Sequence, residues 1–390
     1  RDREIPLRSD RYELGVRQFR TNLETISRVF ERKGIPVFIG SLASNLLDQP
    51  PFAASANAAP RAADSTFAAG KAALEAGDKP RGDSLLSLSR DLDVVRFRAP
   101  SEFNAIIQQV TAGTGGTYVP VAEAFAAASP AGVPGANIFL EHVHPTRDGQ
   151  ALIARVFFDA LRRTDLLRAK IDSGRLAPFA SYRRGMDLTP FDERIAYHST
   201  RTLTSRWPFV PVSQQRDYRA TYTPSSFLDS LAFAVSAGER WEIAKLRLAA
   251  DYERKSQFDS AAAEYAGLAR DAPLANEPLL FLARALGEGG RSAEAEAALK
   301  RAVAIRPTTA ALNVLGKRSA ERHDLGQAAS YLERSISLDA NQPEVLYELA
   351  LVYGMSRNIP AAQQAALRLS QLAPNDPRLP RLLSVLKAQR

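Results

Sequence analysis

Apolar residues in the first part of the chain recur with a helical period that short apolar runs interrupt. Residues 11–33 carry a large apolar side chain at every third or fourth position, which predicts an amphipathic helix ended by Gly34. The run PVFIGS (36–41) then predicts a buried strand, and YVPV (118–121) predicts another. Further helices are expected at 64–77, 84–92, 101–112 and 147–163.

This alternation divides the chain into three parts. Helices that alternate with short apolar strands predict an α/β layered domain over residues 1–165. Residues 166–235 are less regular and richer in Pro, Ser, Thr and Tyr, which predicts an irregular connector that packs on both neighbours. Residues 236–390 follow a different, longer period and predict an all-α part.

The long period is carried by three series of positions that step by 34, 33 and 34 residues. Small residues recur at Ala249, Ala283, Gly316 and Ala350 and again at Ala261, Ala295, Ala328 and Ala362, and helix-ending positions recur at Pro273, Pro307, Ala340 and Pro374. Small residues let the two helices of a hairpin approach closely, and proline prevents a helix from continuing. Four helical hairpins are therefore expected.

The period resembles the tetratricopeptide repeat, and stacked repeats of that kind form a surface for peptides or partner proteins. The resemblance implies a protein or peptide partner. A purely structural array that packs on the first domain remains the alternative.

Composition excludes several classes of function. The net charge is +8, but the basic residues are dispersed among nearly as many acids and no block of five Lys or Arg occurs, so no nucleic-acid partner is expected. The chain has no cysteine, which excludes disulfides, thiol catalysis and cysteine metal sites. No apolar run approaches the roughly 20 residues of a membrane helix, so no membrane segment is expected.

The segment EHVHP (141–145) is the richest short stretch in chemistry, and three interpretations of it are open. Glu141 and His144 stand three residues apart, so a turn brings the carboxylate to the imidazole and makes an acid–base pair. His142 and His144 are instead metal ligands if other residues join them, Asp148 being the nearest candidate. The third interpretation is a histidine with a structural role only.

A second family resemblance rests on this segment and on three others. Glu141 to Pro145, followed by Gly149 and a helix, resembles the terminal block of SGNH (GDSL-like) hydrolases. Residues 44–52, 77–104 and 187–195 resemble a bacterial branch of that superfamily that carries tetratricopeptide tails. The resemblance implies part of a flavodoxin-like three-layer α/β domain, with His144 as general base, Glu141 in place of the usual orienting Asp, and no metal or organic cofactor.

Other residues of the family site are less clear in this sequence. The nucleophilic Ser and the oxyanion-hole residues match no position. Ser84 lies in Gly-Asp-Ser-Leu (82–85), which spells the nucleophile motif, but it follows a helix-like stretch, so Asp83 or Ser84 is expected to be a helix N-cap. Asn45 is a weaker candidate, in a loop after a strand, and Arg98 is expected on the surface.

The resemblance to SGNH hydrolases thus implies a serine ester hydrolase that acts on an acyl or acetyl ester of a carbohydrate or lipid. The chain begins with Arg1, and we expect it to be part of a longer protein that supplies the nucleophile. The resemblance suggests a membrane-anchored, extracytoplasmic location for the full-length protein. The alternative is a non-catalytic tetratricopeptide scaffold with a degenerate hydrolase-like platform.

Overall fold

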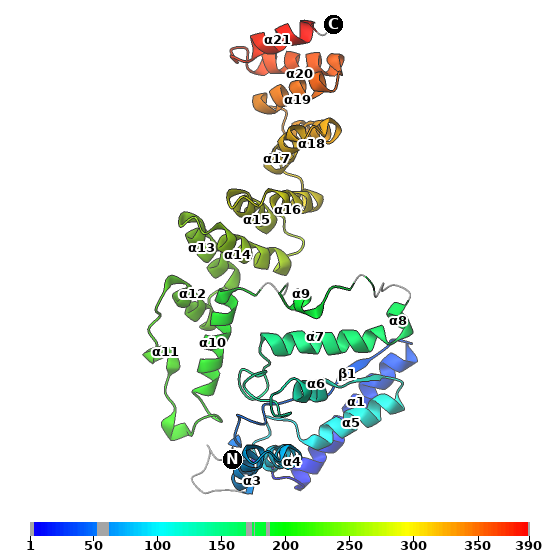
Figure 1. Cartoon of the computed structure of the whole chain (residues 1–390), viewed down its shortest axis with the longest axis vertical. Coiled ribbons are helices and arrows are strands. Elements are labelled where there is room, and N and C mark those ends of the chain that lie inside the picture. The colour runs from blue at the N-terminus through cyan, green and yellow to red at the C-terminus, as the bar shows by residue number, and fades with distance from the viewer. Residues whose placement is uncertain (1–3, 53–61, 169–173, 175, 185–187, 389–390) are drawn as a thin grey trace. The chain divides into compact units, whose positions relative to one another are not determined.

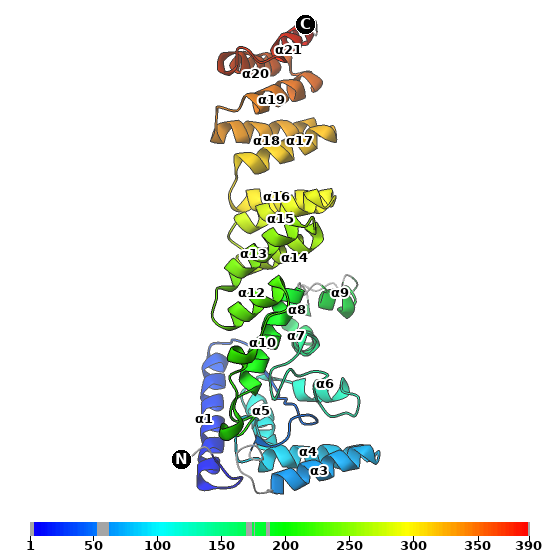
Figure 2. The same ribbon diagram turned by 90° about the vertical axis from the view of Figure 1, so that its left-hand side faces the viewer.

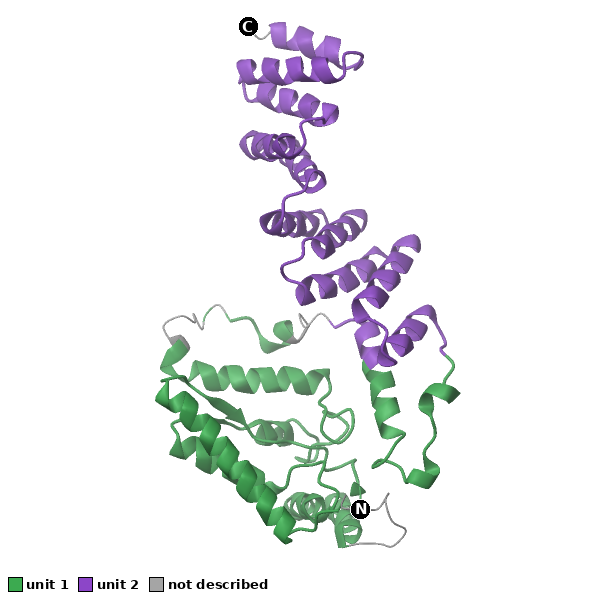
Figure 3. Cartoon of the chain, turned by 180° about the vertical axis from the view of Figure 1, so that it is seen from behind, with its two compact units in different colours: residues 1–186, 196–223 green, residues 187–195, 224–390 purple. Residues whose placement is uncertain are grey.

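The chain divides into two compact units. The computed structural model describes residues 4–52, 62–168, 174, 176–184 and 188–388. Unit 1 contains residues 1–186 and 196–223, and unit 2 contains residues 187–195 and 224–390 (Figure 3). Every crossing of the chain between the units falls within the segment 166–235.

A short parallel sheet lies in unit 1. Strands β1 (Phe38–Gly40) and β2 (Thr117–Val119) form at the two predicted places and pair in parallel, with Phe38 opposite Thr117. Helix α5 (Ser101–Gly113) and helix α7 (Arg147–Arg162) contact both strands. Figure 1 shows α7 on one side of the strands and α5 on the other.

The predicted flavodoxin-like three-layer domain is not supported by this architecture. In the part of the chain that the structure describes, the sheet has these two strands alone. The apolar run at 138–140 does not extend the sheet, because it turns back on its own loop: Leu140 N–H donates to His144 C=O (2.8 Å) and Thr146 N–H donates to Ile138 C=O (2.8 Å). Its backbone groups are thus already paired locally.

The first helix, α1 (Asp10–Arg32), forms where its apolar period predicts it. Ser9 caps its N-terminus by accepting from Tyr12 N–H, and Gly34 follows its end with a φ of 63°. The apolar face packs on α5, where the rings of Phe19 and Phe103 stack 4.4 Å apart.

The other predicted helices of unit 1 also form. The largest difference is at the helix predicted for residues 84–92, which begins earlier, at Lys79. The remaining helices of this unit are α3 (Ala62–Glu75), α4 (Lys79–Leu92), α6 (Val121–Ala127), α8 (Asp165–Arg168), α9 (Phe179–Arg184) and α11 (Tyr218–Thr221). Helix α10 (Pro190–Thr204) contributes residues to both units. The segment 166–235 is therefore more helical than its composition predicts. A helical spacing along α10 connects Phe191, Ile195 and the buried His198. The proline and threonine residues of this segment make that spacing hard to recognise in the sequence.

Unit 2 confirms the four tetratricopeptide-like hairpins. The paired helices are α13 (Trp241–Arg254) with α14 (Phe258–Asp271), α15 (Glu277–Glu288) with α16 (Ser292–Ile305), α17 (Thr309–Glu321) with α18 (Leu325–Leu338), and α19 (Pro343–Met355) with α20 (Ile359–Leu372). Helix α12 (Phe227–Ser236) packs before them and α21 (Leu379–Ala388) after them. Figure 2 shows the hairpins stacked one after another.

The small residues of the period are buried where the helices of a hairpin meet. Ala249, Ala261, Ala328, Ala350 and Ala362 are fully buried. At Gly316 an added Cβ would lie 2.6 Å from Cδ2 of the buried Leu332, so this hairpin is closed more tightly than an alanine allows.

The turns inside the hairpins follow the same period. Ser256, Gly290, His323 and Arg357 stand at the same position of successive hairpins and have φ angles of 55°, 77°, 59° and 60°. A residue with positive φ just after a helix is the usual way to end it, and glycine adopts that conformation without a steric penalty. Three of the four turns thus use a residue that the conformation disfavours.

No helix among the described residues is both long and apolar enough to cross a membrane.

Candidate functional site

The segment that the sequence singles out for chemistry is a tight loop held against the start of α7. Thr146 caps α7 by accepting from Gly149 N–H (3.3 Å). A Cβ at Gly149 would lie 2.7 Å from the Ile138 carbonyl oxygen, so the loop approaches the helix as only glycine permits. The loop geometry therefore depends on Gly149.

A buried carboxylate organises this loop. Glu141 has a side chain that is 2% exposed, and it accepts hydrogen bonds from the backbone N–H groups of His142 (2.6 Å) and His144 (2.8 Å). Its two oxygens also bond Nδ1 of the two imidazoles, Oε2 to His142 and Oε1 to His144. The structure thus brings together the three candidate residues of the EHVHP segment.

His144 is the accessible member of this group. Its side chain is 66% exposed, and its Nδ1 faces Glu141. A carboxylate on Nδ1 fixes the tautomer and leaves Nε2 able to accept a proton. Among the described residues, the imidazole hydrogen-bonds Glu141 alone.

His142 is buried among aromatic rings. Its ring centroid lies 5.3 Å from that of Phe52 and 5.2 Å from that of Phe209. Burial, with the charges of His144 and Arg98 adding to it, lowers the pKa of His142 from 6.5 to about 4. His142 is therefore neutral near pH 7.

A buried ion pair holds the neighbouring loop in place. Nη1 of Arg98 donates to the carbonyl oxygens of Asn45 (3.0 Å) and Gln49 (2.8 Å), and Asp93 Oδ2 accepts from Phe52 N–H (2.8 Å). Arg98 and Asp93 face each other at 3.4 Å, and burial lowers the pKa of Arg98 to about 10 although Asp93 opposes the shift. The expectation that Arg98 lies on the surface is wrong.

Asn45 lies beside the histidine loop, but its amide side chain is used locally. Its backbone N–H donates to His142 C=O (2.9 Å), and its Oδ1 accepts from Asp48 N–H (2.9 Å), so the side chain stabilises its own loop. Sequence reasoning missed the contacts of Phe52 and Phe209 with His142, because each contact joins residues that are distant along the chain.

Ser84 does not lie at a strand end or at a helix start. Helix α4 begins at Lys79, and Asp78 caps it by accepting from Arg81 N–H (3.2 Å), so the expectation that Asp83 or Ser84 is the cap is wrong. Ser84 is exposed on the second turn of α4. Gly82 is buried, and a Cβ there would collide with Leu74 of α3. Packing of the α3–α4 hairpin therefore explains the glycine of the Gly-Asp-Ser-Leu motif.

The metal-site interpretation gains no further ligands. Asp148 lies in the first turn of α7. No group of three or more His, Cys, Asp or Glu side chains placed to hold a metal ion occurs in the part of the chain that the structure describes.

Unit 2 presents a second candidate site on the first helices of three of its four hairpins, α13, α17 and α19. Large apolar side chains are exposed there at Ile243 (43%), Leu246 (39%), Val314 (41%), Leu351 (39%) and Met355 (51%). Counted from the small residue of each hairpin, they stand at −6, −3, −2, +1 and +5. At 3.6 residues per turn these positions fall within about 100° of the helix circumference. We call these five residues the first-helix face.

Several solved structures are similar to part of this chain. No family model matches the chain. No curated protein matches it either. MamA is 21% identical with a TM-score of 0.35, over 38% of this chain and 81% of MamA. YrrB, described as "a TPR protein with an unusual peptide-binding site", is 13% identical with a TM-score of 0.34, over 41% of this chain and 92% of YrrB. PilF of Pseudomonas aeruginosa is 21% identical with a TM-score of 0.34, over 51% of this chain and 86% of PilF. The repeat assignment rests on the observed hairpins and their period.

Proposed function

We propose that the chain is a protein-interaction module whose repeats bind a protein segment through the first-helix face. The observation that carries this proposal is the alignment of the five exposed apolar side chains on one side of three first helices, α13, α17 and α19. Scattered exposed apolar residues are ordinary, but an aligned set on a repeat array is typical of a binding surface.

The energetics support binding by a few apolar anchors. Full burial of a leucine- or methionine-sized side chain contributes about 1.5–3 kcal/mol. The first helices of the first two hairpins are also tied to each other, since Arg284 of α15 donates to Glu253 of α13 (Nη2 to Oε2, 2.9 Å). A surface that is already ordered loses less conformational entropy when a partner binds.

Site-specific photo-cross-linking tests this proposal. A benzophenone amino acid replaces Leu351 on the first-helix face, and in a matched chain it replaces Leu274, which is 87% exposed in the turn after α14. Irradiation in an extract of the native source is expected to give a discrete adduct from position 351 and none from position 274.

A second variant distinguishes specific binding from nonspecific adsorption. Val314→Glu changes the neighbouring first helix, so it is expected to reduce the adduct formed at position 351 at least tenfold. The proposal fails if both positions give the same adducts, or if Val314→Glu leaves the adduct at 351 unchanged.

A second candidate function concerns unit 1, and the hydrogen bond from His144 to the buried Glu141 favours it. An imidazole oriented by a carboxylate with its other nitrogen accessible has the arrangement of a general base. The resemblance to SGNH hydrolases suggests the hydrolysis of an acyl or acetyl ester. A serine nucleophile and oxyanion donors would have to join His144 for that reaction.

Hydrolysis of a chromogenic short-chain ester, by a longer protein that joins a serine nucleophile and oxyanion donors to this chain, tests the second candidate. If His144 is the base, His144→Ala reduces the rate at least a hundredfold. Ser84→Ala is the matched control and leaves the rate unchanged, because Ser84 lies within a helix. Equal rates for the parent protein and His144→Ala contradict this assignment.

A further inference from the structure

A cavity of about 490 Å³ lies in unit 1 between the C-terminal half of α7 and the segment 176–182, which includes the start of α9. Figure 1 shows α9 beside α7. The volume falls within the range of small-ligand pockets, about 300–1,000 Å³. The histidine loop does not contribute to the lining of this cavity.

The walls of this cavity are apolar, and their side chains are accessible. Phe158 of α7 is 38% exposed and Tyr182 of α9 is 53% exposed. The half-buried side chains of Leu176 and Phe179 complete the walls. An alkyl chain bound here would remove this accessible apolar surface from water, which is the main source of affinity for an apolar ligand.

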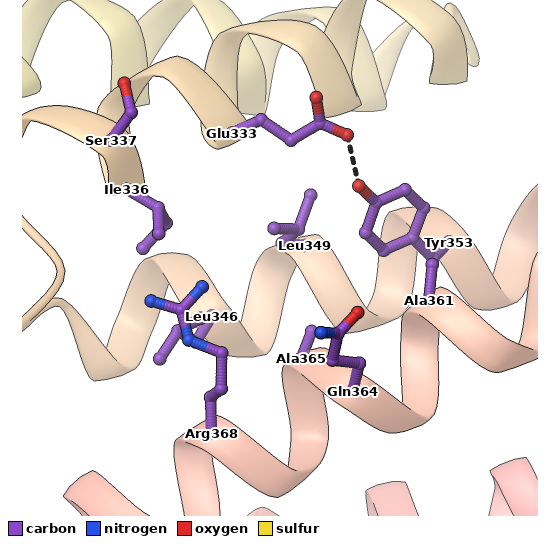
Figure 4. Close-up of a pocket in the computed structure, with 10 residues that line it drawn as sticks. All are labelled: Glu333, Ile336, Ser337, Leu346, Leu349, Tyr353, Ala361, Gln364, Ala365 and Arg368. Atoms are coloured by element: carbon purple, nitrogen blue, oxygen red, sulfur yellow. Dashed lines mark hydrogen bonds between the residues drawn. The ribbon is translucent and has the colours of Figure 1, made fainter.

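The cavity between α18, α19 and α20 offers no such surface (Figure 4). Its lining residues Leu346, Leu349 and Ala365 are at most 5% exposed, because their side chains already pack in the core of the last hairpins. An apolar ligand there would bury little further apolar area, so the cavity of unit 1 is the better candidate.

Contacts between the two sides of the unit 1 cavity hold it open. The guanidinium carbon of Arg155 on α7 lies 5.0 Å from the centre of the Phe179 ring, which is a cation–π contact. Within the opposite segment, Ala177 N–H donates to the Tyr182 hydroxyl (3.1 Å). A cavity whose walls are already ordered loses less conformational entropy when a ligand binds.

The cavity also carries a net positive charge. Arg155 and Arg162 share one carboxylate, since Arg155 Nε lies 3.7 Å from Asp159 Oδ2 and Arg162 Nη2 lies 3.4 Å from Asp159 Oδ1. The two arginine side chains are 54% and 43% exposed. Two guanidinium groups and one carboxylate in the lining leave one positive charge uncompensated. A ligand that joins an apolar chain to one negative charge complements both features of the site.

We propose that this cavity binds a medium-chain fatty carboxylate, with the alkyl chain against the aromatic walls and the carboxylate on Arg155 and Arg162. A guanidinium donates two parallel hydrogen bonds to a carboxylate, which fixes the position of the head group. Arg155, Phe158 and Arg162 are three and four residues apart, so they lie on one stripe of α7 and one ligand can contact all three.

This site goes beyond both functions proposed above. The first-helix face belongs to unit 2. The histidine loop precedes α7, and Phe158 lies about 16 Å along the helix from its start at Arg147. The fatty carboxylate is therefore a separate ligand of unit 1.

Isothermal titration calorimetry of the full chain with octanoate tests this proposal. Octanol keeps the alkyl chain but lacks the charge, and butyrate keeps the charge but has a short alkyl chain. Octanoate is expected to bind, octanol to bind about fivefold more weakly, and butyrate to bind weaker by roughly tenfold or more. Equal binding of octanoate and either control, or no binding of octanoate at millimolar concentration, overturns the proposal.

Three substitutions locate the site. Arg162→Ala is expected to weaken octanoate about fivefold. Arg163→Ala is the matched control, because Arg163 is exposed but does not line this cavity, and it is expected to leave binding unchanged. Ala154→Trp is expected to abolish binding, since Ala154 lines the cavity at an exposed position of α7 where an indole ring fills the space.

Vesicles of phosphatidylglycerol distinguish a free ligand from a membrane, because they present acyl chains and negative charge in a bilayer. Sedimentation of the protein with these vesicles, without a calorimetric signal from octanoate, overturns the proposal in favour of a lipid surface. Unchanged binding by Arg162→Ala, or an equal loss with Arg163→Ala, overturns the assignment of the head-group site. The comparison of the three ligands uses the unsubstituted chain, so it stays decisive even if a variant fails to fold.

Discussion

Lys245 Nζ lies 2.5 Å from Glu264 Oε2, and the lysine side chain is completely buried. The same ammonium also donates to Asp192 Oδ2 (3.0 Å) and to Thr189 Oγ1 (3.2 Å). These contacts attach the short segment 188–195, at the start of α10, to the first hairpin of unit 2. The sequence motif at 187–195 thus has a structural role within unit 2, although residue 187 lies outside the described residues.

Removing this lysine is expected to destabilise unit 2 strongly. Lys245→Ala leaves Glu264 buried without its cation, which costs about 3–5 kcal/mol in the free energy of unfolding. Urea unfolding followed by Trp241 fluorescence measures the loss, since Trp241 Nε1 donates to Asp192 (2.9 Å) within the same cluster. Lys300→Ala removes an exposed lysine from Glu296, which keeps its ion pair with Arg322, and is expected to cost less than about 1 kcal/mol. Equal losses in the two variants would contradict the role given to the buried pair.

The turn of the last hairpin offers a stabilising substitution. Arg357 has a φ of 60° and an exposed side chain, so Arg357→Gly removes strain without removing a contact and is expected to stabilise the chain by about 0.5–1 kcal/mol. The matched opposite is Gly290→Ala, at the same position of an earlier hairpin with a φ of 77°, which is expected to destabilise by about 1 kcal/mol. Urea unfolding followed by circular dichroism checks both signs. A loss of stability in Arg357→Gly would show that the arginine side chain matters.

The other three hairpins have alanine at the position of Gly316, but alanine is expected to destabilise the third hairpin. Gly316→Ala places a methyl group against the buried Leu332 and is expected to cost about 1–3 kcal/mol, although alanine favours helix formation. The fourth hairpin pairs Ala350 with Ala366 at these two positions. The double variant Gly316→Ala with Leu332→Ala is therefore expected to lose less than the sum of the single variants. Additive losses would contradict a steric conflict between the two residues.

The stability of unit 1 is expected to fall as the pH falls from about 7 to about 4. The pKa of His142 is about 4 in the folded chain and returns to about 6.5 on unfolding, so the unfolded chain binds the proton first. The contribution is complete above pH 6.5 and decreases below it, and the full difference is about 3 kcal/mol.

Urea unfolding at several pH values measures this effect through Trp207, the tryptophan of unit 1, in a Trp241→Phe background. His142→Gln keeps a hydrogen-bond donor toward Glu141 but does not titrate, and it is expected to show a shallower pH dependence. The same slope with and without His142 would show that another group is responsible.

The sequence predicts the repeats well because their signal is local and recurs. Each hairpin repeats the same buried positions, as at Ala249 and Ala350, so a period of 34, 33 and 34 residues is visible without any long-range information. The proximity of Glu141 to His144 is also a local property, since both lie in one turn.

The parts that the sequence does not predict depend on contacts between distant residues. The burial of Arg98 follows from carbonyl groups of residues 45–50, roughly fifty positions earlier in the chain. The apolar run at 138–140 has the composition of a strand, and its hydrogen bonds to its own loop are what remove it from the sheet.

The central claim is that the chain acts by binding a protein on the first-helix face. Hydrogen–deuterium exchange of the chain with and without the protein that cross-links to position 351 tests this claim most directly. The account predicts slower exchange in peptides from α17 and α19 on binding, with exchange at 138–149 unchanged. Protection confined to 138–149, with none in α17 or α19, would contradict it and place the function at the histidine loop.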